Sequence, residues 1–234
     1  MRLLRPLFLV PAGLLAAVGA GAWLARRWGY RVAETTRDLT GTPGEVPMRT
    51  PERGPDVQTM ADGTGPRFHR RYRVDIAGTA WTPERLMARV AADPDDFCAA
   101  ELARFEKTAG EEGALAEGDE FMVHINGPWN GPVRVASVEP HAFTLVTREG
   151  HMEAGSITFS AMPSPAVPDA LRFTIESWAR SRDAVVDLAY DDLELAKEAQ
   201  QAMWTFFCER AVEVCGGEAA GPVEVLTERD NHGD

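Results

Sequence analysis

The stretch AKEAQQAMWTFFCERA, residues 196–211, is the part of the sequence that most directly indicates the fold. Apolar residues recur there near 3.6-residue spacing, the period of an amphipathic helix. They are Ala196, Ala199, Met203, Phe207 and Val214, with Leu195, Ala202 and Phe206 beside them. The pair Gly216–Gly217 supplies a helix stop. We therefore predict one long helix over residues 185–215, with an apolar stripe that must pack against another layer.

The residues before this helix are dominated by patterns typical of β-strands. In RFHRRYRVDI, residues 67–76, one face carries Phe68, Tyr72, Val74 and Ile76, with Arg70 interrupting. Such alternation predicts a half-buried strand. Further strands are predicted at 120–125, 132–139, 142–148, 155–162 and 170–179.

Two short helices are predicted between the first strand and the others. Thr82-Pro83 and Asp93-Pro94 each place a capping residue before a proline at the first helical position. The first would begin the helix ERLMARVAA, and the second the helix DDFCAAELARFEK. Strands in succession with segregated helices define an α+β class. We expect a helix-grip arrangement, in which a curved antiparallel sheet wraps around the long C-terminal helix and leaves a cavity between them.

This order of elements resembles the Bet v 1-like superfamily, which includes START domains and polyketide cyclases. Four stretches, GDEFMVHINGPWNGPVRV (118–135), GHMEAGSITF (150–159), FTIESWARS (173–181) and AKEAQQAMWTFFCERA, are similar to a narrower family known as domain of unknown function 1990. The resemblance covers roughly residues 67–216. It implies a fold and a pocket but no catalytic residues. The six predicted strands are one fewer than the superfamily's usual seven.

The N-terminus carries a membrane signal. Residues 6–25 are uncharged, with Arg2 and Arg5 before them and Arg26, Arg27 and Arg31 after them. About 20 apolar residues suffice to span a bilayer, so we expect an anchor over residues 1–27. The arginine balance favours a single-pass topology with a cytoplasmic body. A cleaved signal peptide and a mis-assigned start codon are the alternatives.

The remaining chain divides by composition into three parts. Residues 28–66 are rich in Gly, Pro and Thr without an apolar period, which predicts a flexible linker. Residues 67–217 form the expected folded domain, and residues 218–234 are predicted to be a disordered tail.

Composition and motifs exclude several classes of function. A net charge of −12 argues against a nucleic-acid partner. The three cysteines form no CxxC pair, and Cys208 and Cys215 are too far apart on one helix for a disulfide. Reduced thiols and a cytosolic compartment are favoured. The sequence contains no GxSxG, P-loop, GxGxxG or HExxH element, so we expect no metal and no cofactor.

The most suggestive polar pair is His151 and Glu153, in the predicted turn before the strand that begins near residue 155. If Ile157, Phe159 and Ala161 point inward, the same period turns this pair inward too, unless a bulge at Gly155 reverses it. The pair is then a structural turn, a ligand contact, or an acid/base or metal pair. The expected ligand-binding residues are His151, Glu153, Phe173, Ile175, Met203 and Phe207.

Other polar and aromatic residues have simpler interpretations. His124 alternates with Phe121, Val123 and Ile125, so we expect an exposed imidazole. In the predicted strand 170–179, Leu171, Phe173 and Ile175 are expected to face inward. Trp178 and Arg180 alternate with this apolar set, so we expect them on the outer face of the sheet.

Three functions remain open. The first is a membrane-tethered module that binds a small apolar or amphipathic molecule, such as a lipid. The second is a cyclase- or hydrolase-like enzyme that uses His151 and Glu153 as acid and base. The third is a membrane-tethered interaction protein, which a large exposed apolar patch would support.

Overall fold

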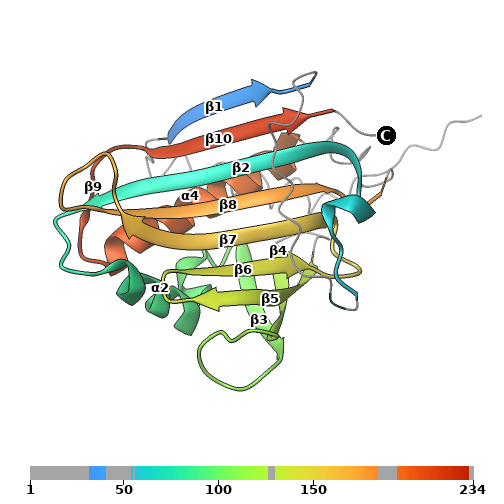
Figure 1. The fold of residues 1–234 in the computed structure, drawn as a ribbon, viewed down its shortest axis with the longest axis horizontal. Helices are drawn as coiled ribbons and strands as arrows, with labels where there is room; N and C mark the ends of the chain where they lie inside the picture. Colours follow the sequence, from blue (N-terminus) through green and yellow to red (C-terminus); the bar gives the residue numbers. More distant parts are fainter. Residues whose placement is uncertain (1–31, 41–53, 55, 126–129, 184–193, 232–234) are drawn as a thin grey trace, which may run out of the picture.

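The computed structural model describes residues 32–40, 54, 56–125, 130–183 and 194–231. In this part of the chain, ten strands form one curved sheet in the order β1-β10-β2-β8-β7-β6-β5-β4-β3, with β9 beside β2 (Figure 1). Every ladder is antiparallel except the parallel pair β1–β10. The strands are β1 (Val32–Asp38), β2 (Thr64–Ala77), β3 (Ala103–Ala109), β4 (Glu120–Ile125), β5 (Gly131–Glu139), β6 (Ala142–Thr147), β7 (Glu153–Pro163), β8 (Leu171–Ser181), β9 (Glu218–Ala219) and β10 (Val223–Asp230).

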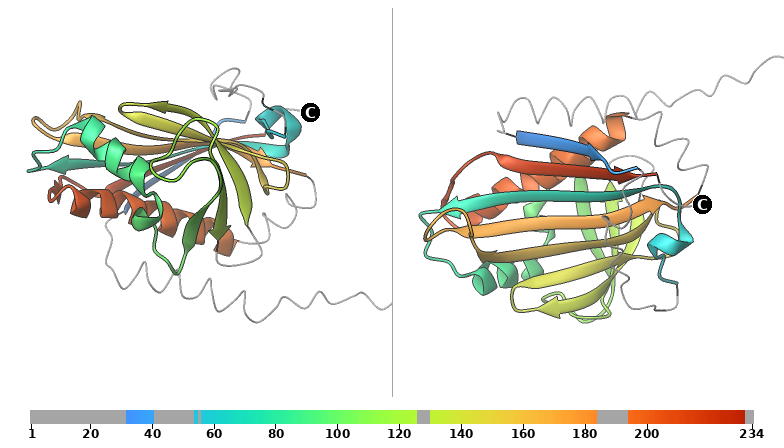
Figure 2. Two further views of the ribbon diagram at one scale, coloured as in Figure 1. Left: turned by 90° about the horizontal axis from the view of Figure 1, so that it is seen from below. Right: turned by 45° about the horizontal axis from the view of Figure 1, so that its top comes forward.

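The long helix α4 (Glu194–Val214) lies across one face of the sheet, and α2 (Pro83–Ala92) lies on the same side (Figure 2). Two short 3-10 helices complete the described elements, η1 (Met60–Asp62) before β2 and η2 (Asp95–Phe97) after α2. Thr82 caps α2 as predicted, because its hydroxyl accepts the Arg85 N–H. The expected helix-grip arrangement, a curved sheet against a long helix, is confirmed.

The core between sheet and helix is aromatic. Phe207 of α4 is fully buried. Its ring centroid lies 5.2 Å from that of Phe97, 5.2 Å from that of Phe159 and 5.9 Å from that of Phe173. Aromatic pairs at such separations contribute beyond their buried area. This cluster joins η2, β7 and β8 to α4 and fixes where the helix crosses the sheet.

The second predicted helix, DDFCAAELARFEK, is wrong. Asp95–Phe97 forms a single 3-10 turn, and the chain then enters strand β3. Ala103 and Phe105 are buried while Arg104 and Glu106 are exposed, which is a strand's period of two. The Asp95 carboxylate accepts the Phe105 N–H at 2.7 Å, and β3 pairs with β4. This tertiary pairing overrides the local helical spacing, and β3 joins β2 and β4–β8 as the seventh strand that the superfamily resemblance implied.

The flexible linker predicted over residues 28–66 and the disordered tail predicted over residues 218–234 are also wrong where the structure describes them. Residues 32–38 form β1, and residues 218–219 and 223–230 form β9 and β10. All seven residues of β1 are exposed, so its sequence carries no alternation to recognise. Backbone pairing with β10 holds β1 in place, while Val223 and Val225 of β10 enter the core.

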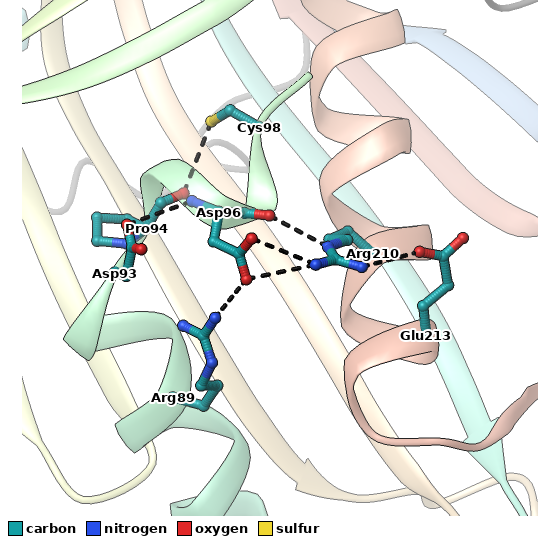
Figure 3. A network of polar contacts seen from close by, with 7 residues as sticks. All are labelled: Arg89, Asp93, Pro94, Asp96, Cys98, Arg210 and Glu213. Atoms are coloured by element: carbon teal, nitrogen blue, oxygen red, sulfur yellow. Dashed lines mark hydrogen bonds and ion pairs between the residues drawn. The ribbon is translucent and has the colours of Figure 1, made fainter. Parts of the chain in front are cut away.

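A polar network joins the helices on the same side of the sheet (Figure 3). Asp96 of η2 forms ion pairs with Arg89 of α2 and with Arg210 of α4, where Arg210 Nη2 lies 3.2 Å from Asp96 Oδ1. Arg210 also pairs with Glu213 at 3.2 Å and donates from Nε to the Asp96 carbonyl at 3.2 Å. These groups are about one third exposed or more. The network therefore orients α2, η2 and α4 more than it stabilises them.

The outer face of the sheet holds a histidine between two carboxylates. His69 of β2 places Nδ1 2.8 Å from Glu228 Oε2 on β10 and Nε2 2.7 Å from Glu176 Oε1 on β8. Its ring stacks on Trp178 at 5.0 Å between centroids. A neutral imidazole has one N–H and could donate to only one carboxylate. Both contacts together require the protonated ring.

The surroundings of His69 favour this charged form. Burial alone would lower the pKa of His69, but its hydrogen bonds to Glu176 and Glu228 raise the pKa above its ordinary value. Arg71 lies 3.8 Å from Glu176, and Arg37 of β1 lies 3.5 Å from Glu228. The charged ring thus links β10, and β1 behind it, to the centre of the sheet.

Replacing His69 tests this link. We expect His69→Gln to lower the free energy of unfolding by about 2 kcal/mol at pH 6, the usual contribution of charge-assisted hydrogen bonds. Because the folded-state pKa is raised, the stabilisation is fully present below about pH 6.5. It is lost as the pH rises through the folded-state pKa.

Urea unfolding of both proteins at pH 6 and pH 9 measures the effect. His124→Gln serves as the matched control, because His124 bonds a carboxylate through one nitrogen only in the described structure. A difference between wild type and His69→Gln that is the same at both pH values would contradict the assignment.

Candidate functional site

A cavity of about 80 Å³ lies between α4 and the concave face of the sheet. Its walls are mostly apolar, and they come from β3 to β8 and from α4. The described lining residues are Phe105, Val123, Ile125, Val133, Leu145, Val146, Thr147, His151, Glu153, Ser156, Ile157, Ser177, Ala179, Gln200, Met203 and Trp204. Polar side chains are the minority, and His151 and Glu153 provide its ionisable groups.

The turn between β6 and β7 brings His151 and Glu153 to the cavity. Pairing of β7 with β8 runs without a register shift from Glu153 to Pro163, so no bulge at Gly155 reverses the phase. Phe159 and Ala161 are buried, as the alternation predicted. Both polar residues line the cavity. The sequence therefore predicted their orientation correctly.

Residues before the predicted domain hold this turn in place. Gln58 is buried, and its side-chain amide donates to the carbonyls of His151 at 3.0 Å and Glu153 at 3.3 Å. Asp56 accepts from the Arg148 guanidinium at the start of the turn. Sequence reasoning missed Gln58, because it lies in a stretch without periodicity whose partners are about 90 positions away.

The hydrogen bonds of His151 hold its ring on the Glu153 backbone. Nδ1 lies 2.9 Å from the Glu153 backbone nitrogen, from which it can accept, and 3.0 Å from the Glu153 carbonyl oxygen, to which it can donate. The ring is thus bonded to this backbone in either neutral tautomer. Burial lowers the pKa of His151, although the nearby Glu153 opposes the shift. The ring is therefore uncharged near neutral pH.

Gly131 of β5 makes room for this ring. A Cβ added at Gly131 would overlap His151 at Cδ2 and Nε2. The imidazole thus packs directly on the glycine backbone, which fixes the ring plane. The sequence placed this glycine at the end of a Gly/Pro-rich turn, and no local signal pointed to His151.

Glu153 has a buried basic partner. Arg70 of β2 is 5% exposed, and its Nη1 lies 3.3 Å from Glu153 Oε1. The Arg70 guanidinium also lies over the Phe68 ring, 4.6 Å from its centroid. Sequence reasoning noted Arg70 only as the residue that interrupts an apolar face. An arginine at an inward-facing position of a strand indicates a buried charge that needs a partner of opposite charge. This was the signal available in the sequence.

The six predicted ligand-binding residues fall into two groups. His151, Glu153 and Met203 line the cavity. Phe173, Ile175 and Phe207 are at most 1% exposed and belong to the packed core behind it. Thirteen further described residues line the cavity, among them Trp204, Ser177 and Gln200.

The other candidates have structural partners. His124 donates from Nε2 to the Glu106 carboxylate at 2.7 Å and keeps about a third of its side chain exposed. Trp178 is on the outer face as expected but is buried against His69. Arg180 donates to the Gly65 carbonyl at 2.8 Å.

Metal and thiol chemistry find no support in the described residues. No group of three or more His, Cys, Asp or Glu side chains in them is arranged to hold a metal ion. Cys98, Cys208 and Cys215 are unpaired and buried. Burial raises the pKa of the Cys215 thiol to about 11, so a reactive thiolate is disfavoured.

No family model and no curated protein sequence matches the chain, so the resemblance to the domain of unknown function 1990 family is not confirmed. Solved structures show a distant likeness. Norcoclaurine synthase from Thalictrum flavum, in complex with dopamine and hydroxybenzaldehyde, is 12% identical, with 73% of this chain and 98% of that chain covered and a TM-score of 0.45. A hypothetical protein from Helicobacter pylori is 10% identical, with 62% and 86% covered and a TM-score of 0.44.

Ara h 8.0201 is 10% identical to this chain, with 62% of this chain and 99% of that chain covered and a TM-score of 0.40. Norcoclaurine synthase and Ara h 8 have the Bet v 1-like fold that the element order suggested. At TM-scores below 0.5 these likenesses carry no conclusion about ligand or activity.

None of the described helices is long and apolar enough to cross a bilayer. The anchor predicted over residues 1–27 lies outside the described residues.

Substituting Gly131 tests how the cavity holds His151. We expect Gly131→Ala to push the imidazole off the glycine backbone and to break its bond to the Glu153 N–H, because the new methyl group overlaps the ring. In NMR spectra of histidine ring nitrogens, the His151 signals should shift and broaden. Gly221→Ala is the control, since a Cβ there meets no atom within 4 Å. Unchanged His151 signals in Gly131→Ala would disprove the packing.

Proposed function

We propose that this chain is a binding domain for a small, largely apolar ligand that enters the cavity between α4 and the sheet. The observation that carries the proposal is the cavity's composition, apolar walls with a few convergent polar groups at one end. Small-molecule sites in proteins share this composition. The polar end would orient the ligand while the walls supply affinity.

The size of the cavity limits what can enter it. Ligand pockets for drug-sized molecules measure roughly 300–1,000 Å³, whereas this cavity measures about 80 Å³. A small molecule, or one end of a longer amphipathic molecule such as a lipid, fits this volume. The flexible side chain of Met203 in the wall would adapt to different ligand shapes.

An enzyme that uses His151 and Glu153 as acid and base is less well supported. The Glu153 carboxylate already has a basic partner, because Arg70 Nη1 lies 3.3 Å from its Oε1. Burial lowers the pKa of His151, and its Nδ1 is already bonded to the backbone. The two side chains thus have separate partners, and neither is poised to pass a proton to the other.

An interaction protein is also less well supported. Large apolar side chains exposed in the described part of the chain are Val32, Val138 and Met162. They lie on β1, β5 and β7, three strands that are not neighbours in the sheet. Single exposed apolar residues are ordinary in soluble domains.

We also infer that residues 6–25 tether the domain to a membrane as a single span, with the body on the cytoplasmic side. The length of the apolar run and its flanking arginines support this inference. β1 begins at Val32, soon after this run, so the tether would reach the sheet at its β1 edge.

Native mass spectrometry of the full chain in a mild non-ionic detergent tests the binding function. We expect an additional mass that disappears on denaturation. In Ser177→Leu the larger side chain occupies the cavity, so the additional mass should be lost. Ser160→Leu is the matched control, because Ser160 alternates with the inward-facing Phe159 and Ala161 on the same sheet. A ligand-free wild-type chain, or retention of the mass in Ser177→Leu, would refute the proposal.

Deletion of residues 1–27 tests the tether. We expect the full chain to sediment with membranes and to resist extraction by alkaline carbonate, since its attachment is hydrophobic. The shortened chain should remain in the supernatant. Release of the full chain by carbonate alone would exclude a membrane span.

A further inference from the structure

We propose that the cavity selects an uncharged ligand that carries a hydroxyl group, bonded to Nε2 of His151 beside the Arg70–Glu153 ion pair. This inference rests on the proposed binding function and names its ligand class. It follows from three features of the cavity, which are the ring nitrogen Nε2 of His151, the compensated charge of Glu153 and the available volume.

The first feature is a ring nitrogen without a described partner. His151 Nδ1 is bonded to the Glu153 backbone, whereas no hydrogen bond joins Nε2 to another described residue, and the side chain lines the cavity. Nε2 donates in one neutral tautomer and accepts in the other. A ligand hydroxyl group can form a hydrogen bond with Nε2 in both cases, whereas a hydrocarbon that displaces water from this nitrogen leaves it without a partner.

The second feature is a charge that is already compensated. Among the described lining residues, Glu153 carries the only formal charge, and Arg70 pairs with it at 3.3 Å. An ammonium group on a ligand would have to compete with Arg70 for this carboxylate. A carboxylate on a ligand would face the like charge of Glu153. Buried ions need a partner of their own, so both kinds of charged ligand are disfavoured.

A hydroxyl group meets neither obstacle. It both accepts and donates hydrogen bonds, so it can bond to His151 Nε2 in either tautomer of the ring and leaves the Arg70–Glu153 ion pair in place. Hydroxyl recognition by buried polar groups discriminates strongly against analogues that lack the group. A neutral polar head on an apolar body thus matches both the walls and the polar end.

The third feature is the volume. A water molecule needs about 10–15 Å³ of cavity measured this way. A cavity of about 80 Å³ therefore accepts a group the size of a short branched alcohol. Isobutanol, isobutylamine and isobutyrate share this shape and differ in charge at pH 7.5. They are the probes for the experiment.

The test is an NMR titration of the full chain in lipid nanodiscs with each probe. We expect isobutanol to bind at least tenfold more tightly than the amine or the acid, and to shift the His151 Nε2 signal of the wild-type chain. His151→Phe keeps a planar ring but removes the hydrogen-bonding nitrogen, and it should bind isobutanol about tenfold more weakly. His124→Phe is the matched control and should bind as wild type. Partition of the probes into lipid affects every variant equally.

A second variant guards against a misfolded His151→Phe. Glu153→Gln keeps the shape of the side chain but leaves Arg70 without the Glu153 charge. We expect it to strengthen isobutyrate binding several-fold, because the acid can then pair with Arg70. Tightest binding of the amine, tightest binding of the acid, or equal isobutanol affinity in wild type and a folded His151→Phe would overturn the inference.

Measuring xenon binding distinguishes failure of the hydroxyl inference from failure of the binding function. Xenon is a purely apolar probe that reports an accessible apolar cavity without needing the polar end. Xenon binding without a preference for isobutanol over the charged probes would overturn the hydroxyl inference alone. Absence of binding by xenon and by all three probes would overturn the binding function as well.

Discussion

The packing of Phe207 into the concave face of the sheet is the contact on which the rest of the structure depends. Its ring contacts aromatic rings from η2, β7 and β8. These contacts fix the crossing point of α4 over a sheet that curves away on either side (Figure 2). Because the aromatic rings fill one part of the space beneath the helix, the remaining space near Met203 and Trp204 is the cavity. Core and cavity are thus two parts of one interface, and Phe173 and Ile175 belong to the first part.

Burial of charge sets the character of that cavity. Arg70 and Glu153 form an ion pair on the inner face of the sheet, where either charge alone would be costly to bury. Because the two charges are opposite, the ion pair adds no net charge to the cavity. The His151 ring, uncharged and packed on Gly131, adds a hydrogen-bonding group without adding a charge. The arrangement favours recognition of a neutral group over proton transfer.

On the opposite face of the sheet, charged side chains hold neighbouring strands together. His69 is protonated between Glu176 and Glu228, and this places a cation among strands that carry carboxylates at the surface. Together with Val223 and Val225 it holds β10 to β2, and β10 in turn supports the wholly exposed β1. The residues nearest to the proposed tether therefore become part of the sheet through backbone pairing and not through a core of their own.

The sequence by itself determined the elements whose pattern is local. The 3.6-residue stripe of α4, the alternation of β4 to β8, and the cap at Thr82 were all readable, and with them the inward orientation of His151 and Glu153. Only the tertiary structure decided the rest. β3 was hidden because its apolar spacing also suits a helix, and pairing with β4 made it a strand. β1 and β10 were hidden because their stabilising partners are distant in sequence. Gln58, Arg70 and Gly131 shape the candidate site through contacts with residues far along the chain, and such contacts leave no local pattern.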